Sequence, residues 1–116
     1  MSTPYIPEAG DIVWLNFTPQ TGHEQAGRRP AVVLSPSAYN SKTGLLVCVP
    51  VTNQIKGYPF EVVLSGTEIS GAALADQVKS LDWRSRQAQF KSKISDVEMR
   101  GIKAKIAALL SLGCSV

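Results

Sequence analysis

The sequence is poor in the residues that build disulfide frameworks and metal centres. It contains two cysteines and one histidine in 116 residues, and Cys48 lies inside an apolar run while Cys114 lies near the end of the sequence. We find no HExxH, no CxxC, no pair of histidines, no acidic cluster suited to magnesium and no Gly-rich phosphate loop. We therefore expect reduced thiols, no metal site and no cofactor.

Long hydrophobic runs are also lacking. No apolar run approaches the roughly 18 residues of a membrane-spanning helix, and the first residues show no basic region followed by an apolar one. We therefore expect a cytoplasmic protein without a membrane partner. Charged residues make up 18% of the chain, and the net charge of +3 is too small to indicate nucleic-acid binding by itself. The 44% apolar content predicts one folded domain over residues 1–116.

The pattern of apolar residues predicts short strands and one helix. After an arm over residues 1–10, strand patterns cover 11–17, 30–34, 45–52, 60–65, 72–79 and 89–94. Pro50 indicates a bulge or an edge in the third of these. Ser95 and Glu98 form a capping box that begins a helix running to about residue 112, with Gly113 as its stop.

The apolar face of this helix would consist of Met99, Ile102, Ile106, Leu109 and Leu110. These elements predict a mainly β, α+β fold, namely a small, partly open SH3-like barrel with the helix packed on it.

Two adjacent arginines, Arg28 and Arg29, lie where a polar loop meets an apolar strand. Pro30 biases Arg29 toward an extended backbone, so its side chain would leave the loop at a defined point. The loop, residues 18–29, is longer than most hairpin connections and is a candidate binding loop. Surface arginines commonly pair with a carboxylate such as Glu24, so a purely structural role remains an alternative.

Five segments carry a family resemblance. They are residues 5–7, 10–14, 24–36, 56–62 and 75–80, with the sequences YIP, GDIVW, EQAGRRPAVVLSP, KGYPFEV and ADQVKS. Over nearly its whole length the chain resembles the MazF (PemK-type) toxins, the ribosome-independent mRNA interferases of bacterial toxin–antitoxin pairs. The resemblance implies the MazF/PemK/CcdB type of barrel and an endoribonuclease that cuts single-stranded RNA at short sites and stops translation and growth. It also implies a homodimer neutralised by an acidic MazE-like antitoxin, with a heterohexameric toxin–antitoxin complex as one possible assembly.

A nuclease without a metal can use the 2′-hydroxyl of RNA as its nucleophile, which leaves 2′,3′-cyclic phosphate and 5′-hydroxyl ends and spares DNA. The resemblance assigns the catalytic arginine to Arg29 and the catalytic threonine to Thr52. A guanidinium can stabilise phosphate charge, but its pKa above about 12 is unsuited to a general base, so Glu24 is an alternative proton acceptor. Thr52 could donate to the phosphate or the leaving oxygen. A threonine at a strand end more commonly satisfies a turn.

RNA recognition calls for aromatic rings, amides and positive charges. Trp14 and Phe17 could stack on bases, although both are as well suited to a core. His23 could act as a base or be merely solvated, and Arg28 stands where some relatives have histidine. The residues that we expect to bind RNA are Phe17, Arg28, Asn40, Asn53, Lys56, Gln77, Lys79 and Arg86.

Two other functions fit the same fold. A CcdB-like toxin would poison DNA gyrase through protein contacts without enzymatic activity, and it would depend on the C-terminal helix instead of Arg29. A plain RNA-binding barrel would bind RNA in a salt-sensitive manner and leave it intact.

Overall fold

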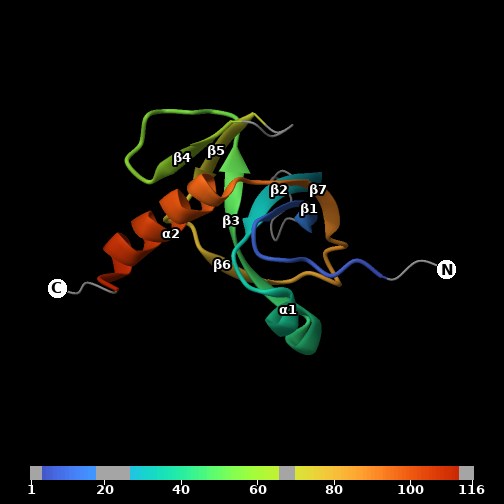
Figure 1. Ribbon diagram of the computed structural model, residues 1–116. Coiled ribbons are helices and arrows are strands. Elements are labelled where there is room, and N and C mark those ends of the chain that lie inside the picture. Colours follow the sequence, from blue (N-terminus) through green and yellow to red (C-terminus); the bar gives the residue numbers. More distant parts are fainter. Residues whose placement is uncertain (1–3, 18–26, 66–69, 113–116) are drawn as a thin grey trace.

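The computed structural model describes residues 4–17, 27–65 and 70–112. Its elements are β1 (Asp11–Phe17), β2 (Gly27–Val33), α1 (Ser37–Thr43), β3 (Leu45–Thr52), β4 (Glu61–Leu64), β5 (Gly71–Leu74), β6 (Lys79–Asp82), β7 (Gln89–Lys93) and α2 (Asp96–Leu110). A curled sheet forms most of the molecule, and α2 lies against it (Figure 1). The prediction of a mainly β, partly open barrel with a C-terminal helix is confirmed. Neither described helix is long and apolar enough to cross a membrane.

The central strand β3 changes partner along its length. The sheet order is β4-β5-β3-β2-β1-β7, and β6 also pairs with β3. The first half of β3 pairs with β6 from Leu45 to Cys48, whereas its last two residues, Val51 and Thr52, pair with β5. Pro50 lies between these two ladders, where β3 needs no hydrogen bond on that side. The predicted irregularity at Pro50 is thus a change of partner strand.

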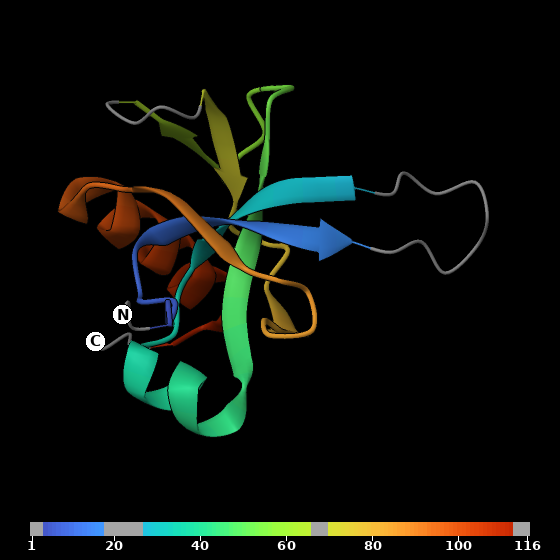
Figure 2. The ribbon, with the colours of Figure 1, turned by 90° about the vertical axis from the view of Figure 1, so that its right-hand side faces the viewer.

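This change of partner explains one wrong prediction. The apolar pattern over 72–79 predicted a single strand, but the structure divides it into β5 and β6 with a turn between them. Both pieces pair with β3, at opposite ends of that strand. The predicted strand 30–34 also begins earlier, at Gly27, because β2 pairs with β1 from Phe17↔Gly27 onward. Figure 2 shows β1 and β2 side by side.

The curled sheet buries apolar side chains on both faces. One cluster packs toward α2 and includes Ile12, Val32, Val49, Val51 and Ile102. The other cluster includes Val13, Leu15, Ala31, Val33, Leu46, Cys48 and Trp83. Side chains alternate along a strand, so a strand residue outside both clusters can still be assigned to the face of one of them.

The capping box at the start of α2 is confirmed. Ser95 Oγ accepts from the Glu98 backbone N–H at 3.1 Å, and Glu98 Oε1 accepts from the Ser95 N–H at 3.0 Å. The second oxygen of Glu98 accepts from Ser65 N–H at 2.6 Å, which attaches the helix to the end of β4. The predicted apolar face is shorter than expected, because Leu109 and Leu110 are exposed. Gly113, the predicted stop, lies outside the described residues.

Candidate active site

Arg29 and Thr52 extend from the same face of the sheet at the same end of neighbouring strands. The β2–β3 ladder pairs Val33 with Cys48 and Ala31 with Pro50, and the same register continued by two residues sets Arg29 opposite Thr52. Both positions lie two residues beyond the last pair of the β2–β3 ladder, on the face of the cluster that includes Cys48. Arg29 is exposed and Thr52 is half-buried. The family resemblance assigned these two residues to one site, and strand alternation gives them a shared face.

Two further cations lie on this face. Lys79 is paired with Cys48 in the β3–β6 ladder, and directly paired residues point to the same side. Burial raises the pKa of Cys48 to about 11, and the positive charges of Lys79 and Arg86 act in the opposite direction. Both cations are therefore close enough to Cys48 to act on its thiol. Arg86 is held in place by a bond from its Nη1 to the Asn16 carbonyl at 3.1 Å.

A pocket of about 360 Å³ opens beside Thr52. Its lining residues come from the end of β3, the 53–60 loop, β4, the end of β5 and the segment after it: Thr52, Gln54, Lys56, Tyr58, Glu61, Leu74, Asp76 and Gln77. Thr52 Oγ1 accepts from the Gln54 N–H at 3.1 Å, and a hydroxyl that accepts this bond keeps its own proton to donate. Of the predicted RNA-binding residues, Lys56 and Gln77 thus lie in one pocket with Thr52.

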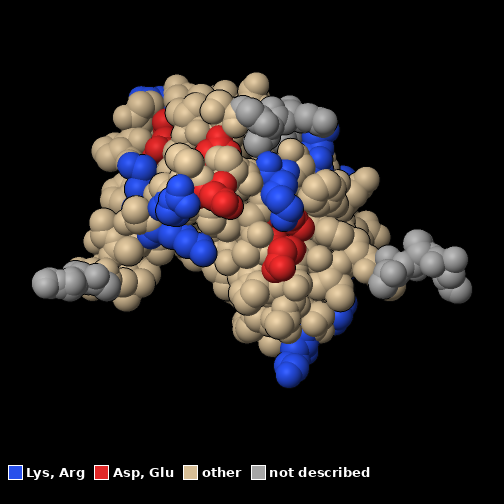
Figure 3. All heavy atoms as spheres, in the orientation of Figure 1, with Lys and Arg blue, Asp and Glu red and all other residues tan. Residues whose placement is uncertain are grey.

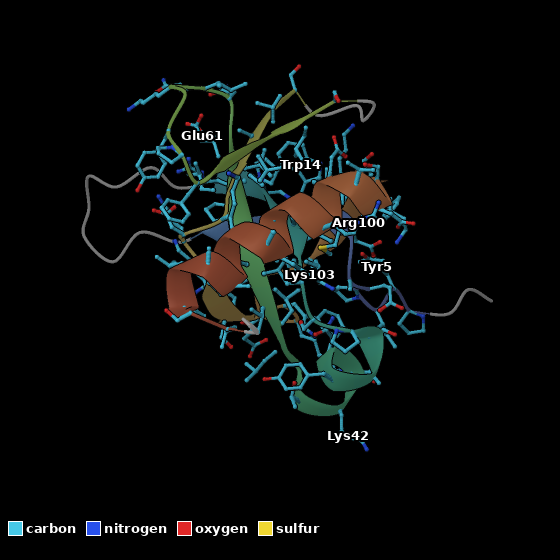
Figure 4. The ribbon with its side chains drawn as sticks, turned by 60° about the vertical axis from the view of Figure 1, so that its left-hand side comes forward. Tyr5, Trp14, Lys42, Glu61, Arg100 and Lys103 are labelled. Carbon is cyan, nitrogen blue, oxygen red and sulfur yellow. The ribbon has the colours of Figure 1, made fainter. Side chains whose placement is uncertain are left out.

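Hydrogen bonds fix the walls of this pocket. The Glu61 carboxylate accepts from the backbone N–H groups of Lys56 and Gly57 at 3.0–3.2 Å. Across the pocket, Tyr58 donates its hydroxyl to Asp76 Oδ2 at 2.7 Å. Asp76 Oδ1 is buried and has no hydrogen-bond partner within the described part of the chain. Figure 4 shows Glu61 at the end of the molecule opposite Lys42 of α1.

Arg28, which we expected to bind RNA, donates its hydrogen bonds to groups of the protein itself. Strand alternation directs it away from Arg29, and its guanidinium donates to Asn16 Oδ1 at 2.7 Å and to the Gln87 carbonyl at 2.8 Å. It also reaches the Trp14 carbonyl and the side chain of Gln89, at 3.2 and 3.3 Å. These bonds join β2 to β1 and to the segment that leads into β7. The structure therefore favours a bracing role for Arg28 over phosphate binding.

The structure argues against the prediction that Asn40 reads base edges. Its side chain is completely buried, and its amide nitrogen donates to the carbonyls of Pro7 and Ser35 at 2.8 and 3.0 Å. Its Oδ1 accepts from the Ser35 hydroxyl at 2.6 Å, and its backbone carbonyl accepts from Trp83 Nε1. Asn40 is therefore a structural residue that connects α1 to the arm and to Trp83.

The remaining predicted residues either do not line the pocket or lie outside the described part of the chain. Asn53 is exposed and follows Thr52 directly, but it does not line the pocket. Trp14 is half-buried. Glu24 and His23 lie outside the described residues. Phe17 ends β1, paired with Gly27, and its side chain is not among the described ones.

Sequence reasoning did not select Tyr58, Glu61 or Asp76, although all three line the pocket. Tyr58 and Glu61 belong to the KGYPFEV segment, and Asp76 directly precedes Gln77. A usable signal was present at Gly57-Tyr58-Pro59, where two turn-forming residues flank an aromatic ring. The partner of a carboxylate such as Asp76 could not be found without the fold.

Charge is mixed on the face seen in Figure 3, where Lys and Arg side chains alternate with Asp and Glu. The described side chains on this face therefore form no continuous basic surface. Within residues 4–17, 27–65 and 70–112, no three histidine, cysteine, aspartate or glutamate side chains gather as a metal site would require.

Comparison with known proteins assigns the chain to a family. Residues 8–110 match the PemK-like, MazF-like toxins of type II toxin–antitoxin systems. The chain is 58% identical over 110 residues to the endoribonuclease toxin MazF of Escherichia coli K12, covering 95% of this chain and 99% of that one. It is 31% identical to the Escherichia coli endoribonuclease PemK, over 90% of this chain and 82% of that one.

Among solved structures, a crystal structure of MazE-MazF from Deinococcus radiodurans superposes with a TM-score of 0.91 at 52% identity, covering 95% of this chain and 100% of that one. The chain therefore belongs to the PemK-like, MazF-like toxins of type II toxin–antitoxin systems.

Proposed function

We propose that this chain cleaves single-stranded RNA at short, specific sites without a metal ion, and that the RNA's own 2′-hydroxyl is the nucleophile. Membership of the family at 58% identity to an endoribonuclease makes the chain an endoribonuclease toxin. The products would carry 2′,3′-cyclic phosphate and 5′-hydroxyl ends, and cleavage of messenger RNA in the cytoplasm would stop translation.

The observation that supports the proposal best is the shared face of Arg29 and Thr52. The β2–β3 register, continued by two residues, sets Arg29 opposite Thr52, and the pair Cys48↔Lys79 adds a third polar group to the same face. Cyclisation of a phosphodiester needs positive charge over the phosphate and a donor to the leaving 5′-oxygen. A guanidinium fork and a threonine hydroxyl meet these needs at one strand end.

Each residue then has a role set by its chemistry. Arg29 would donate two parallel hydrogen bonds to the phosphate oxygens and stabilise the charge that builds in the transition state. Thr52 would donate its hydroxyl proton toward the phosphate or the leaving oxygen. Glu24 is our candidate for the group that accepts the 2′-hydroxyl proton. Lys56, Lys79 and Arg86 would follow neighbouring phosphates, and Asn53 and Gln77 would contact bases.

We further propose that the chain acts as a homodimer and is neutralised by an acidic antitoxin. The Deinococcus radiodurans relative was crystallised as MazE-MazF. The cations on the Arg29 face are suited to an acidic peptide as much as to RNA, because both are polyanions. An antitoxin that covers this face would exclude the substrate. The complex could be a heterohexamer.

The test is cleavage of a long single-stranded RNA in EDTA, with mapping of the fragment ends. The wild-type protein should give specific cuts with the predicted end groups, and a 2′-deoxy nucleotide at the cut position should abolish the cut. Arg29→Ala should lower the rate by about 10²- to 10³-fold, the effect of removing one donor to a developing oxyanion. Arg100→Ala, which removes an exposed arginine from α2, is the matched control and should cut normally.

Intact RNA after incubation with folded wild-type protein would refute the proposed chemistry. A CcdB-like gyrase poison is not favoured, because the relatives named above are endoribonucleases.

A further inference from the structure

The pocket beside Thr52 contains an aromatic ring to which the proposed chemistry gives no role. Tyr58 lines the pocket, and 47% of its surface is exposed. Among the described residues of the pocket, Tyr58 is the only one with an aromatic side chain. At about 360 Å³ the pocket lies at the lower end of the range of roughly 300–1,000 Å³ for small-ligand sites. Its size therefore suits one planar group with its attached sugar.

The ring of Tyr58 is fixed at its far end and along its side. Its hydroxyl donates to Asp76 Oδ2 at 2.7 Å. This bond and the nearby carboxylate charge raise the pKa of Tyr58, so the hydroxyl keeps the proton that it donates. Phe60 lies beside the ring, with a centroid distance of 5.9 Å and an angle of 52° between the planes. A ring held in this way loses little rotational freedom when a ligand covers it.

The backbone around Tyr58 is fixed as well. Gly57 adopts a positive φ of 75°, which a larger residue would resist. The Glu61 carboxylate accepts from the N–H groups of Lys56 and Gly57, and the Glu61 N–H donates to the Tyr58 carbonyl at 3.0 Å. Hydrogen bonds with Glu61 therefore hold the turn both before and after Tyr58. Such a preorganised ring is what a binding site needs and what a mobile surface loop lacks.

We propose that Tyr58 is a stacking platform for one unpaired base of the RNA, in the nucleotide next to the phosphate held at Arg29 and Thr52. The inference rests on the proposed function for the location of that phosphate. An aromatic ring stacks on any base, so Tyr58 supplies binding and position but little choice of base. The amides of Gln54 and Gln77, which line the same pocket, can donate to and accept from the edge of the stacked base.

The experiment measures the affinity of full-length protein for short 2′-fluoro RNAs, which lack the nucleophilic hydroxyl and cannot be cut. Each position of the RNA is replaced in turn by an abasic nucleotide. For the wild type, one abasic position should weaken binding by about 5- to 100-fold, the range of base–aromatic stacking. Tyr58→Leu should weaken binding to the intact RNA by a similar factor and should no longer respond to that abasic position. Tyr58→Phe, which keeps the ring, should bind within about threefold of the wild type.

Tyr39→Leu is the matched control. Tyr39 is a tyrosine of 39% exposure on α1, at the opposite end of β3 from the pocket, and Figure 1 shows α1 far from β4 and β5. This variant should bind RNA as the wild type does. If Tyr58→Leu binds RNA with normal affinity, Tyr58 is no stacking platform. The same follows if the affinity lost by Tyr58→Leu adds to the affinity lost at every abasic position. The wild type could show the dependence on one abasic position and still fail to cut RNA that carries ordinary 2′-hydroxyl groups. That result would refute the cleavage chemistry and leave the role of Tyr58 as a stacking platform in place.

Discussion

Arg28 Nη1 donates to Asn16 Oδ1 at 2.7 Å across the β1–β2 pair, with its side chain directed away from that of its neighbour Arg29. Strand alternation gives the two arginines different surroundings. Arg29 extends from the face that carries Thr52 and Lys79, whereas Arg28 binds β1 and the segment leading into β7. Two identical side chains, adjacent in sequence, thus extend from opposite faces of β2.

Arg28→Ala should destabilise the protein without removing a phosphate contact. The free energy of unfolding should fall by about 1–2 kcal/mol, because the hydrogen bonds of an exposed guanidinium to Asn16 and Gln87 are lost. The plot of log Kd for single-stranded RNA against log salt should keep its slope. Lys56→Ala should instead reduce that slope by about 0.7, the value for one phosphate contact on a single strand. A reduced slope in Arg28→Ala would contradict the bracing role.

Asn40→Ala should cost about 2–4 kcal/mol of stability and leave the cleavage sites unchanged. The substitution empties a buried position and removes the partners of the Ser35 hydroxyl and the Pro7 carbonyl. Urea unfolding measures the first effect, and end mapping at a temperature where the variant is folded measures the second. Altered base preference in the folded variant would return Asn40 to the set of RNA-reading residues.

Gly71→Ala, a substitution in the neighbouring strand β5, should displace Thr52 and destabilise the protein. Gly71 has a φ of +147°, and a Cβ there would lie 2.2 Å from the Thr52 carbonyl oxygen. That oxygen belongs to the backbone and cannot move aside alone, so Thr52 or β5 must shift. We expect a loss of at least about 2 kcal/mol in the free energy of unfolding, together with slower cleavage.

Gly101→Ala is the matched glycine control for this prediction. Its Cβ would meet Val62 at 3.6 Å, which is ordinary van der Waals contact. Alanine also favours a helix interior over glycine by up to about 1 kcal/mol. This variant should be as stable as the wild type or more stable, and it should cut RNA at the normal rate.

Cys48 should contribute to loss of stability in alkaline solution. Burial raises its pKa from 9.0 to about 11 in the folded protein. Between about pH 9 and 11 the unfolded thiol releases its proton while the folded thiol keeps it, so stability falls as pH rises. Urea unfolding across this range should show a steeper decline for the wild type than for Cys48→Ala. Equal slopes would mean that the folded thiol ionises as readily as the unfolded one.

The parts of the fold that sequence predicted well have strong local signals. The alternation in 11–17 and 45–52 gave β1 and β3 with the bounds that the structure shows, and the capping box gave the start of α2. The division of 72–79 into β5 and β6 depends on where β3 changes partner, which is a tertiary property. The same holds for the site. Local sequence singled out Arg29, and the family resemblance added Thr52. The burial of Asn40 and the pairing of Tyr58 with Asp76 depend on segments far apart in the chain.

The change of partner at Pro50 has a thermodynamic consequence. Within the described residues, the β4–β5 hairpin pairs with the rest of the sheet at Val51↔Ala73 and Thr52↔Ala72, and it packs on the core and on α2. It can therefore open with a lower free energy than β1 and β2, whose six residue pairs lie on the other side of β3. A polyanion that contacts both Arg29 and the pocket would connect the β4–β5 hairpin to the more stable part of the sheet that contains β1 and β2. Occupancy of the site would then register as protection of hairpin amides from hydrogen exchange.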